Sequence, residues 1–135
     1  MARIDASKVW SLNYRLISTV IVGVTPQLTE LGLEVKELFV LAAIDEHPHP
    51  AELAQVLCIP KPTITVYLKR LGSAGLIRRD IDPNDLRRHH LTLTSTGRKA
   101  MTRGLALLAE AYGERLSRLS AAEQAQLAAL LEKLN

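Results

Sequence analysis

The chain has 135 residues, a formal net charge of +3 and a single cysteine, Cys58. This length is sufficient for one domain with its own core, so neither a disulfide nor a metal is needed to hold the fold. A lone cysteine cannot form an internal disulfide, which fits a reducing compartment, and the start of the chain lacks a signal-peptide pattern. The apolar stretch 16–24 is too short to span a bilayer, so we expect a cytoplasmic protein.

Apolar residues recur at three- and four-residue steps along much of the chain and predict six helices. These helices cover 6–30, 34–46, 51–57, 61–74, 94–119 and 120–134. Asp5 or Ser7 can cap the first helix, Pro26 should kink it or make its last turn irregular, and Gly32 can end it. Because a short connection separates the short third helix from the fourth, this pair is typical of a helix-turn-helix unit.

Two strand-like runs, 76–81 and 89–93, follow the fourth helix. Strong turn formers at 82–85 lie between them and predict a small β-hairpin, or wing, with a basic tip. The expected fold class is therefore mainly α with a small β-hairpin wing. We expect one chain-wide unit, 1–135, in which residues 34–98 form a winged helix-turn-helix lobe.

Positive charge is concentrated in this lobe. The segment 61–98 holds eight basic and three acidic residues, whereas the remainder of the chain holds nine basic and eleven acidic ones. A basic segment in an otherwise slightly acidic chain favours a polyanion as its partner.

A set of short motifs runs in order from 31 to 98. They are Leu31-Gly32-Leu33, Glu52-Leu53-Ala54, Lys61-Pro62-Thr63-Ile64-Thr65, Arg70-Leu71, Gly75-Leu76-Ile77-Arg78-Arg79, Asp82-Pro83-Asn84-Asp85-Leu86-Arg87-Arg88, Leu91-Thr92-Leu93-Thr94 and Gly97-Arg98. At this spacing the set resembles the MarR family of bacterial winged-helix regulators. The resemblance implies a homodimer in which the first, fifth and sixth helices interlock. It also implies a palindromic operator and, often, release of DNA by a small phenolic, lipophilic or oxidising signal.

The fourth helix is the expected recognition helix. Ile64, Leu68 and Leu71 recur at i, i+4 and i+7 and should face the core. The side chains left for DNA are Lys61, Thr63, Thr65, Val66, Lys69 and Arg70. Threonines can hydrogen-bond to bases or phosphates, and their methyl groups can contact thymine. The family commonly has Arg or another polar residue where this chain has Val66, which implies weaker direct readout or a shift toward thymine methyls.

The wing supplies the second group of DNA contacts. Arg87 matches the family's tip arginine, which enters the minor groove, where a guanidinium is favoured by negative potential. The resemblance implies that Asp85 holds Arg87 or Arg70 in place through an ion pair. We expect Arg88 to contact a phosphate, and Arg79 or Arg78 to be a further contact.

The helices at 1–31 and 99–135 carry apolar stripes wider than one small lobe can cover, which favours a self-complementary dimer interface. Its candidate residues are Val9, Trp10, Tyr14, Leu16, Leu105, Tyr112, Leu127, Leu130, Leu131 and Leu134. We expect Cys58, in the turn before the recognition helix, to be a buried small apolar residue.

Other classes of function have less support. There is no phosphate loop, nucleophile elbow or paired-cysteine motif, so we expect no enzyme and no cofactor. His47 and His49, between prolines, are interpreted as polar loop residues, and His89 and His90 alternate across a strand and cannot chelate one ion together, so no metal is expected. The predicted function is a DNA-binding transcriptional repressor acting as a homodimer, with a small apolar or phenolic ligand as a further partner. The alternative is a winged helix used for protein–protein contact or dimerisation without ligand sensing.

Overall fold

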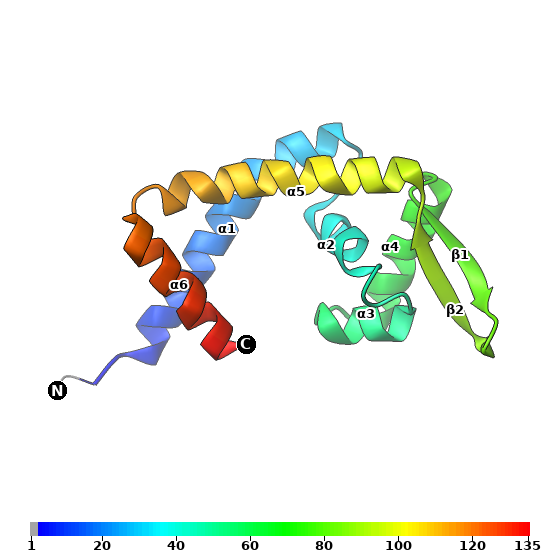
Figure 1. The fold of residues 1–135 in the computed structure, drawn as a ribbon, viewed down its shortest axis with the longest axis horizontal. Coiled ribbons are helices and arrows are strands. Elements are labelled where there is room, and N and C mark those ends of the chain that lie inside the picture. Colours follow the sequence, from blue (N-terminus) through cyan, green and yellow to red (C-terminus); the bar gives the residue numbers. More distant parts are fainter. Residues whose placement is uncertain (1–2) are drawn as a thin grey trace. The chain divides into compact units, whose positions relative to one another are not determined.

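The computed structural model describes residues 3–135 (Figure 1). Its elements are α1 (Ala6–Glu30), α2 (Val35–Ala43), α3 (Pro50–Val56), α4 (Lys61–Ser73), β1 (Ile77–Asp82), β2 (Asp85–Leu93), α5 (Ser95–Leu116) and α6 (Ala121–Leu134). Six helices and one antiparallel two-stranded hairpin confirm the predicted fold class. The chain divides into two compact units, which we call the terminal unit (residues up to Val24 with Ala106–Asn135) and the winged unit (Thr25–Leu105).

Several predicted boundaries differ from the structure, among them the end of α5, which lies at Leu116 and not at 119. Helix α2 ends at Ala43, and the next three residues form a turn. Strand β2 begins at Asp85, not at 89, because β1 pairs with it up to Asp82 opposite Asp85, so only two residues make the hairpin turn. Helix α1 stays α-helical through Pro26 to Glu30, which excludes an irregular last turn, while the alternative of a kink at Pro26 stays a prediction.

Asp5 caps α1, in agreement with one of the two predicted choices. Its Oδ1 accepts the backbone N–H groups of Ser7 at 3.0 Å and Lys8 at 3.3 Å, together with the Ser7 hydroxyl at 2.6 Å. The hydrogen bond from the Ser7 side chain is the main cause that lowers the pKa of Asp5, because these bonds favour the ionised carboxylate.

Three helices end in the same left-handed turn. The second residue after the last helical residue has a positive φ: Gly32 (75°), Cys58 (53°) and Gly75 (73°). Each turn is closed by a pair of backbone hydrogen bonds, such as Ile59 N–H to Ala54 O at 3.1 Å and Cys58 N–H to Gln55 O at 3.3 Å. This is the Schellman arrangement, which turns the chain sharply after a helix and satisfies its last carbonyls. At Cys58 it lets α4 start three residues later, which makes the helix-turn-helix compact.

The prediction for Cys58 is wrong. Its side chain is exposed and makes only a long contact from Sγ to Gln55 O, at 3.8 Å. The reason is the left-handed backbone, which directs the side chain away from the packed side of the turn, while Ile59 is the buried residue there.

A Cys58→Gly variant should therefore be more stable than the parent, by about 0.5–1 kcal/mol. A left-handed φ costs a residue with a Cβ about 1–2 kcal/mol, and the extra entropy that glycine loses on folding offsets part of the gain. Urea unfolding would measure the change. Cys58→Ala keeps the Cβ and should leave the stability nearly unchanged; equal effects of the two substitutions would contradict the explanation.

The core of the winged unit lies between α2, α4 and the neighbouring segments. Its largest fully buried side chains are Leu28, Leu38, Leu41, Ile44, Leu53, Ile64, Leu71 and Leu91. Two glycines let α5 approach this core. A Cβ placed on Gly97 would lie 1.8 Å from the Leu76 carbonyl oxygen, and one on Gly104 would lie 2.7 Å from Leu38 Cδ1.

Within the described residues, no single helix is both long and apolar enough to cross a membrane. The pair Ala6–Glu30 and Val35–Ala43 meets the length and composition criteria only when taken together, across an 81° bend.

Candidate nucleic-acid interface

Helix α4 presents one buried and one exposed face. Ile64, Leu68 and Leu71 are buried, which confirms the predicted core-facing positions. The exposed positions include Lys61, Thr65, Val66 and Lys69, whereas Thr63 is half-buried. The helix therefore offers two cations, a threonine and an apolar side chain to a partner. The Thr65 hydroxyl donates to Lys61 O at 3.1 Å within the helix and retains its acceptor capacity.

Arg70, on the same helix, is occupied by two carboxylates. Its Nη1 donates to Glu34 Oε1 at 3.0 Å, and its Nη2 lies 3.4 Å from Oε1 of the buried Glu37. The hydrogen bond to Glu34, followed by the charge of Glu37, raises the pKa of Arg70. Oε1 of Glu37 also accepts the Glu34 N–H at 2.9 Å, as part of the capping box that begins α2. Arg70 thus fastens α4 to the start of α2, and its charge is largely compensated there.

The ion pair expected between Asp85 and Arg70 or Arg87 is not formed in residues 3–135. Arg70 pairs with Glu34 and Glu37 at α2, and Asp85 Oδ1 accepts the backbone N–H of Arg87 at 3.0 Å. An Asp carboxylate that accepts the backbone N–H two residues later closes the turn locally. Asp85 therefore shapes the hairpin tip and leaves the Arg87 guanidinium free of an acidic partner within the described chain.

The wing is exposed along most of its length and is basic. Arg78, Arg79, Arg87 and Arg88 are all exposed, and the ion pair from Arg78 to Asp80 is long, at 3.8 Å. The hairpin follows α4 directly, and Figure 1 shows it beside that helix. Recognition helix and wing thus belong to one compact unit, as DNA binding through both would require.

Acidic side chains of the lobe hold the wing and the start of α5. Glu52 on α3 accepts from Arg88 Nη2 at 3.1 Å, and Asp45 accepts from both Arg98 Nη atoms at 3.1 and 3.3 Å. Reasoning from the sequence did not find these acidic partners, nor Glu34 and Glu37. Only Glu34 and Glu37 had a signal in the sequence. They are three residues apart and precede an apolar run, which is the spacing of a capping box.

The predicted dimer residues lie on helices that leave them largely uncovered in one chain. Helix α6 buries none of its residues, and the exposed fractions reach 67% at Trp10, 65% at Tyr14 and 79% at Leu134. Val9, Leu105, Leu130 and Leu131 are also exposed. Leu16, Tyr112 and Leu127 are half-buried and line a shared pocket of the terminal unit. Uncovered apolar surface of this kind is typical of interaction surfaces, so the dimer interface stays a prediction.

A helix-turn-helix followed by a basic hairpin defines the winged helix-turn-helix class of proteins. Within that class, the chain matches the MarR family over residues 33–89. It is 32% identical over 97 residues to transcriptional regulator HosA of Escherichia coli, an alignment that covers 70% of this chain and 72% of HosA. It is 29% identical over 136 residues to HTH-type transcriptional repressor Rv2887 of Mycobacterium tuberculosis, covering 99% of this chain and 98% of Rv2887.

Solved structures of MarR-family proteins also align with most of this chain. Rv2887 in complex with salicylic acid aligns with a TM-score of 0.75 and 30% identity, covering 92% of this chain and 93% of that one. A mutant MarR from E. coli complexed with operator DNA aligns with a TM-score of 0.79 and 27% identity, covering 94% and 93%. The chain belongs to the MarR family, a family of transcriptional regulators and not of enzymes.

Proposed function

We propose that this protein is a repressor that binds a pseudo-palindromic DNA operator as a homodimer in the cytoplasm. The observation that carries the proposal is the unpaired guanidinium of Arg87, within the described chain, on an exposed hairpin that follows a helix with Lys61, Thr65 and Lys69 on its open face. The similarity to a MarR mutant complexed with operator DNA supports DNA as the partner. Phosphate contacts from these cations would set affinity, and base contacts from α4 would set specificity.

The open face of α4 favours thymine as the base contacted. Val66 is 56% exposed and cannot donate to a guanine, whereas its methyl groups can pack against a thymine methyl. Thr65 adds a methyl group and one acceptor beside it. Because Arg70 is paired with two carboxylates, we assign it the role of positioning α4 and not the DNA contact expected from the sequence.

A test of the function itself needs no known operator. Sites selected from random duplex DNA by the purified protein should share a two-fold symmetric sequence, with half-sites about one helical turn apart. Binding measured at two salt concentrations should weaken steeply as salt rises, because phosphate contacts release counterions. A protein used only for protein–protein contact would select no sequence and bind DNA at neither salt concentration.

We further propose that a small aromatic acid or phenol releases the protein from DNA. The complex of Rv2887 with salicylic acid supports this class of ligand. Release requires that the ligand bind more tightly to the conformation that does not fit DNA. Salicylate added to the bound operator should therefore lower the bound fraction, and an unchanged fraction would leave the operator proposal standing and exclude this ligand.

The dimer is tested on α6. Leu130 and Leu134 are 57% and 79% exposed in one chain, so Leu130→Glu combined with Leu134→Glu should leave the monomer folded. Burying two unpaired carboxylates at an apolar interface should raise the dimer dissociation constant at least about 100-fold. Light scattering after size-exclusion chromatography would give the mass. Leu86→Glu, at a wing position that is 80% exposed, is the control and should stay dimeric; a parent protein that is monomeric at micromolar concentration would exclude the dimer.

A further inference from the structure

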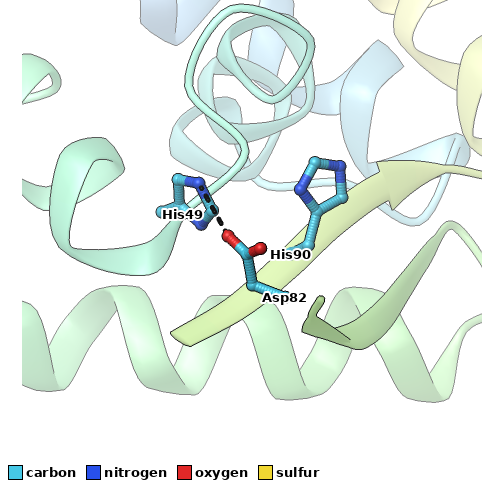
Figure 2. Close-up of side chains that lie close together, drawn as sticks. All are labelled: His49, Asp82 and His90. Carbon is cyan, nitrogen blue, oxygen red and sulfur yellow. Dashed lines mark ion pairs between the residues drawn. The ribbon is translucent and has the colours of Figure 1, made fainter. Parts of the chain in front are cut away.

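Three side chains from separate segments converge where the wing meets the helix-turn-helix. His49 precedes α3, Asp82 ends β1 and His90 lies on β2 (Figure 2). One ligand atom from each lies within 4.8 Å of the others, and His49 Nε2 lies 3.7 Å from Asp82 Oδ2. In the sequence His90 is adjacent to His89, but the tertiary structure places it beside His49 and Asp82.

A backbone contact orients the ring of His49. Its Nδ1 lies 2.9 Å from the carbonyl oxygen of His89, which can only accept, so Nδ1 carries a proton and donates. In the neutral ring, Nε2 then has a lone pair facing the Asp82 carboxylate. A metal ion between this lone pair and the carboxylate, which lie 3.7 Å apart, would be attracted to both.

Asp82 is oriented in the same way. Its Oδ1 accepts the backbone N–H of Asn84 at 2.8 Å, which leaves Oδ2 for the cation. The side chains of His49 and Asp82 are only 14% and 11% exposed, so both are held in a partly desolvated place. Ligands whose second atom is fixed by a backbone group are the usual arrangement around protein-bound metals.

The position of His90 adds a third ligand. Its ring meets that of His49 edge-on, with centroids 5.6 Å apart and an interplanar angle of 81°. All three residues line one open pocket, which also contains the exposed Asp80. The base of the wing is already held nearby by the hydrogen bond from Leu91 N–H to Pro48 O, at 2.7 Å.

From this geometry we propose that His49, Asp82 and His90 form a binding site for a divalent transition metal ion such as Zn²⁺. Two imidazoles and a carboxylate are a ligand set that zinc accepts, with a fourth position open to water. Tetrahedral ligand atoms at about 2.0–2.1 Å from zinc lie about 3.3 Å apart, so small side-chain rotations would close the present spacing. A bound ion would join the loop before α3 to both strands and fasten the wing to the lobe.

The chain offers a matched pair of variants for the test, because it has only four histidines. His49→Gln with His90→Gln removes both proposed imidazole ligands and keeps His47 and His89. His47→Gln with His89→Gln does the reverse, and retains the His89 carbonyl that orients His49. Both variants keep the exposed Cys58, so zinc binding by that thiol would be equal in the two.

Zn²⁺ is titrated into each dialysed protein by calorimetry, and the melting temperature is measured with and without zinc. We expect the parent and the His47/His89 variant to bind one ion per chain and to melt at a higher temperature with zinc. The His49/His90 variant should bind at least about 100-fold more weakly and show no rise. Equal affinities in the two double variants, or a parent that zinc does not stabilise, would overturn the site.

Asp82→Asn provides a second variant should the loss of His49 impair folding. The amide oxygen can still accept the Asn84 N–H, while the negative charge is lost, so zinc affinity should fall about 10-fold or more. Unchanged affinity in Asp82→Asn would exclude the carboxylate as a ligand. Co²⁺ in place of Zn²⁺ gives an absorption spectrum that reports tetrahedral coordination, and an octahedral spectrum would contradict the proposed geometry.

Discussion

Gly97→Ala should destabilise the protein by about 3 kcal/mol or more, a large part of the total for a domain of this size. The added Cβ would lie 1.8 Å from the carbonyl oxygen of Leu76, which is backbone and cannot rotate away. That carbonyl also accepts the N–H of Thr94 at 3.1 Å, and the Thr94 hydroxyl accepts the N–H of Gly97 at 3.0 Å. The added Cβ would therefore push the start of α5 away from the base of the wing and strain both of these hydrogen bonds. Urea unfolding followed by circular dichroism measures the loss.

Two other glycines of α5, Gly113 and Gly104, provide controls for Gly97→Ala. A Cβ added at Gly113 would meet no packed atom of the described chain within 4 Å, so Gly113→Ala should stabilise the helix by about 0.5–1 kcal/mol. Gly104→Ala meets Leu38 Cδ1 at 2.7 Å, a side-chain atom, and should cost less than Gly97→Ala. If alanine at 97 were tolerated as well as alanine at 113, the close approach of α5 to Leu76 would be wrong.

Arg87→Ala should weaken operator binding at least about 10-fold at moderate salt and lower the slope of log affinity against log salt by about one. The reason is that this guanidinium is exposed and has no acidic partner in the described chain. Its full positive charge is therefore available to interact with DNA. Arg88 is paired with Glu52 at 3.1 Å, and DNA must compete with that carboxylate for it. Arg88→Ala should therefore have a smaller effect than Arg87→Ala. Fluorescence anisotropy with the selected operator, over a series of salt concentrations, measures both changes.

Arg118→Ala is the charge-matched control, because it removes one exposed arginine from the turn between α5 and α6, outside the winged unit. Its salt slope should equal that of the parent. Suppose that the parent selects a symmetric operator and that Arg87→Ala binds it as tightly as the parent does. Arg87 would then not be the minor-groove contact, but the proposal of DNA binding would stand. Failure of the zinc experiment would leave both results unaffected, since the metal site is tested without DNA.

Local signals in the sequence located the hairpin and helix α4. The buried positions Ile64, Leu68 and Leu71 follow from helical periodicity alone, and the hairpin follows from turn formers between two short runs. The partners of charged side chains did not follow. Arg70 contacts Glu34, 36 residues away, and Arg98 contacts Asp45, 53 residues away, and no periodic pattern encodes such pairs.

The sequence by itself determined the order of the six helices and the hairpin, the core face of α4 and the basic character of the lobe, because these depend on spacing along the chain. Only the tertiary structure decided which arginines stay free, why Cys58 is exposed, and that His49, Asp82 and His90 meet. Each of these depends on distances between segments that are remote in sequence, or on a backbone turn whose sign no single residue type dictates. The spacing of apolar residues along the chain determines which face of a helix or strand is buried, and tertiary packing determines which residues that face contacts.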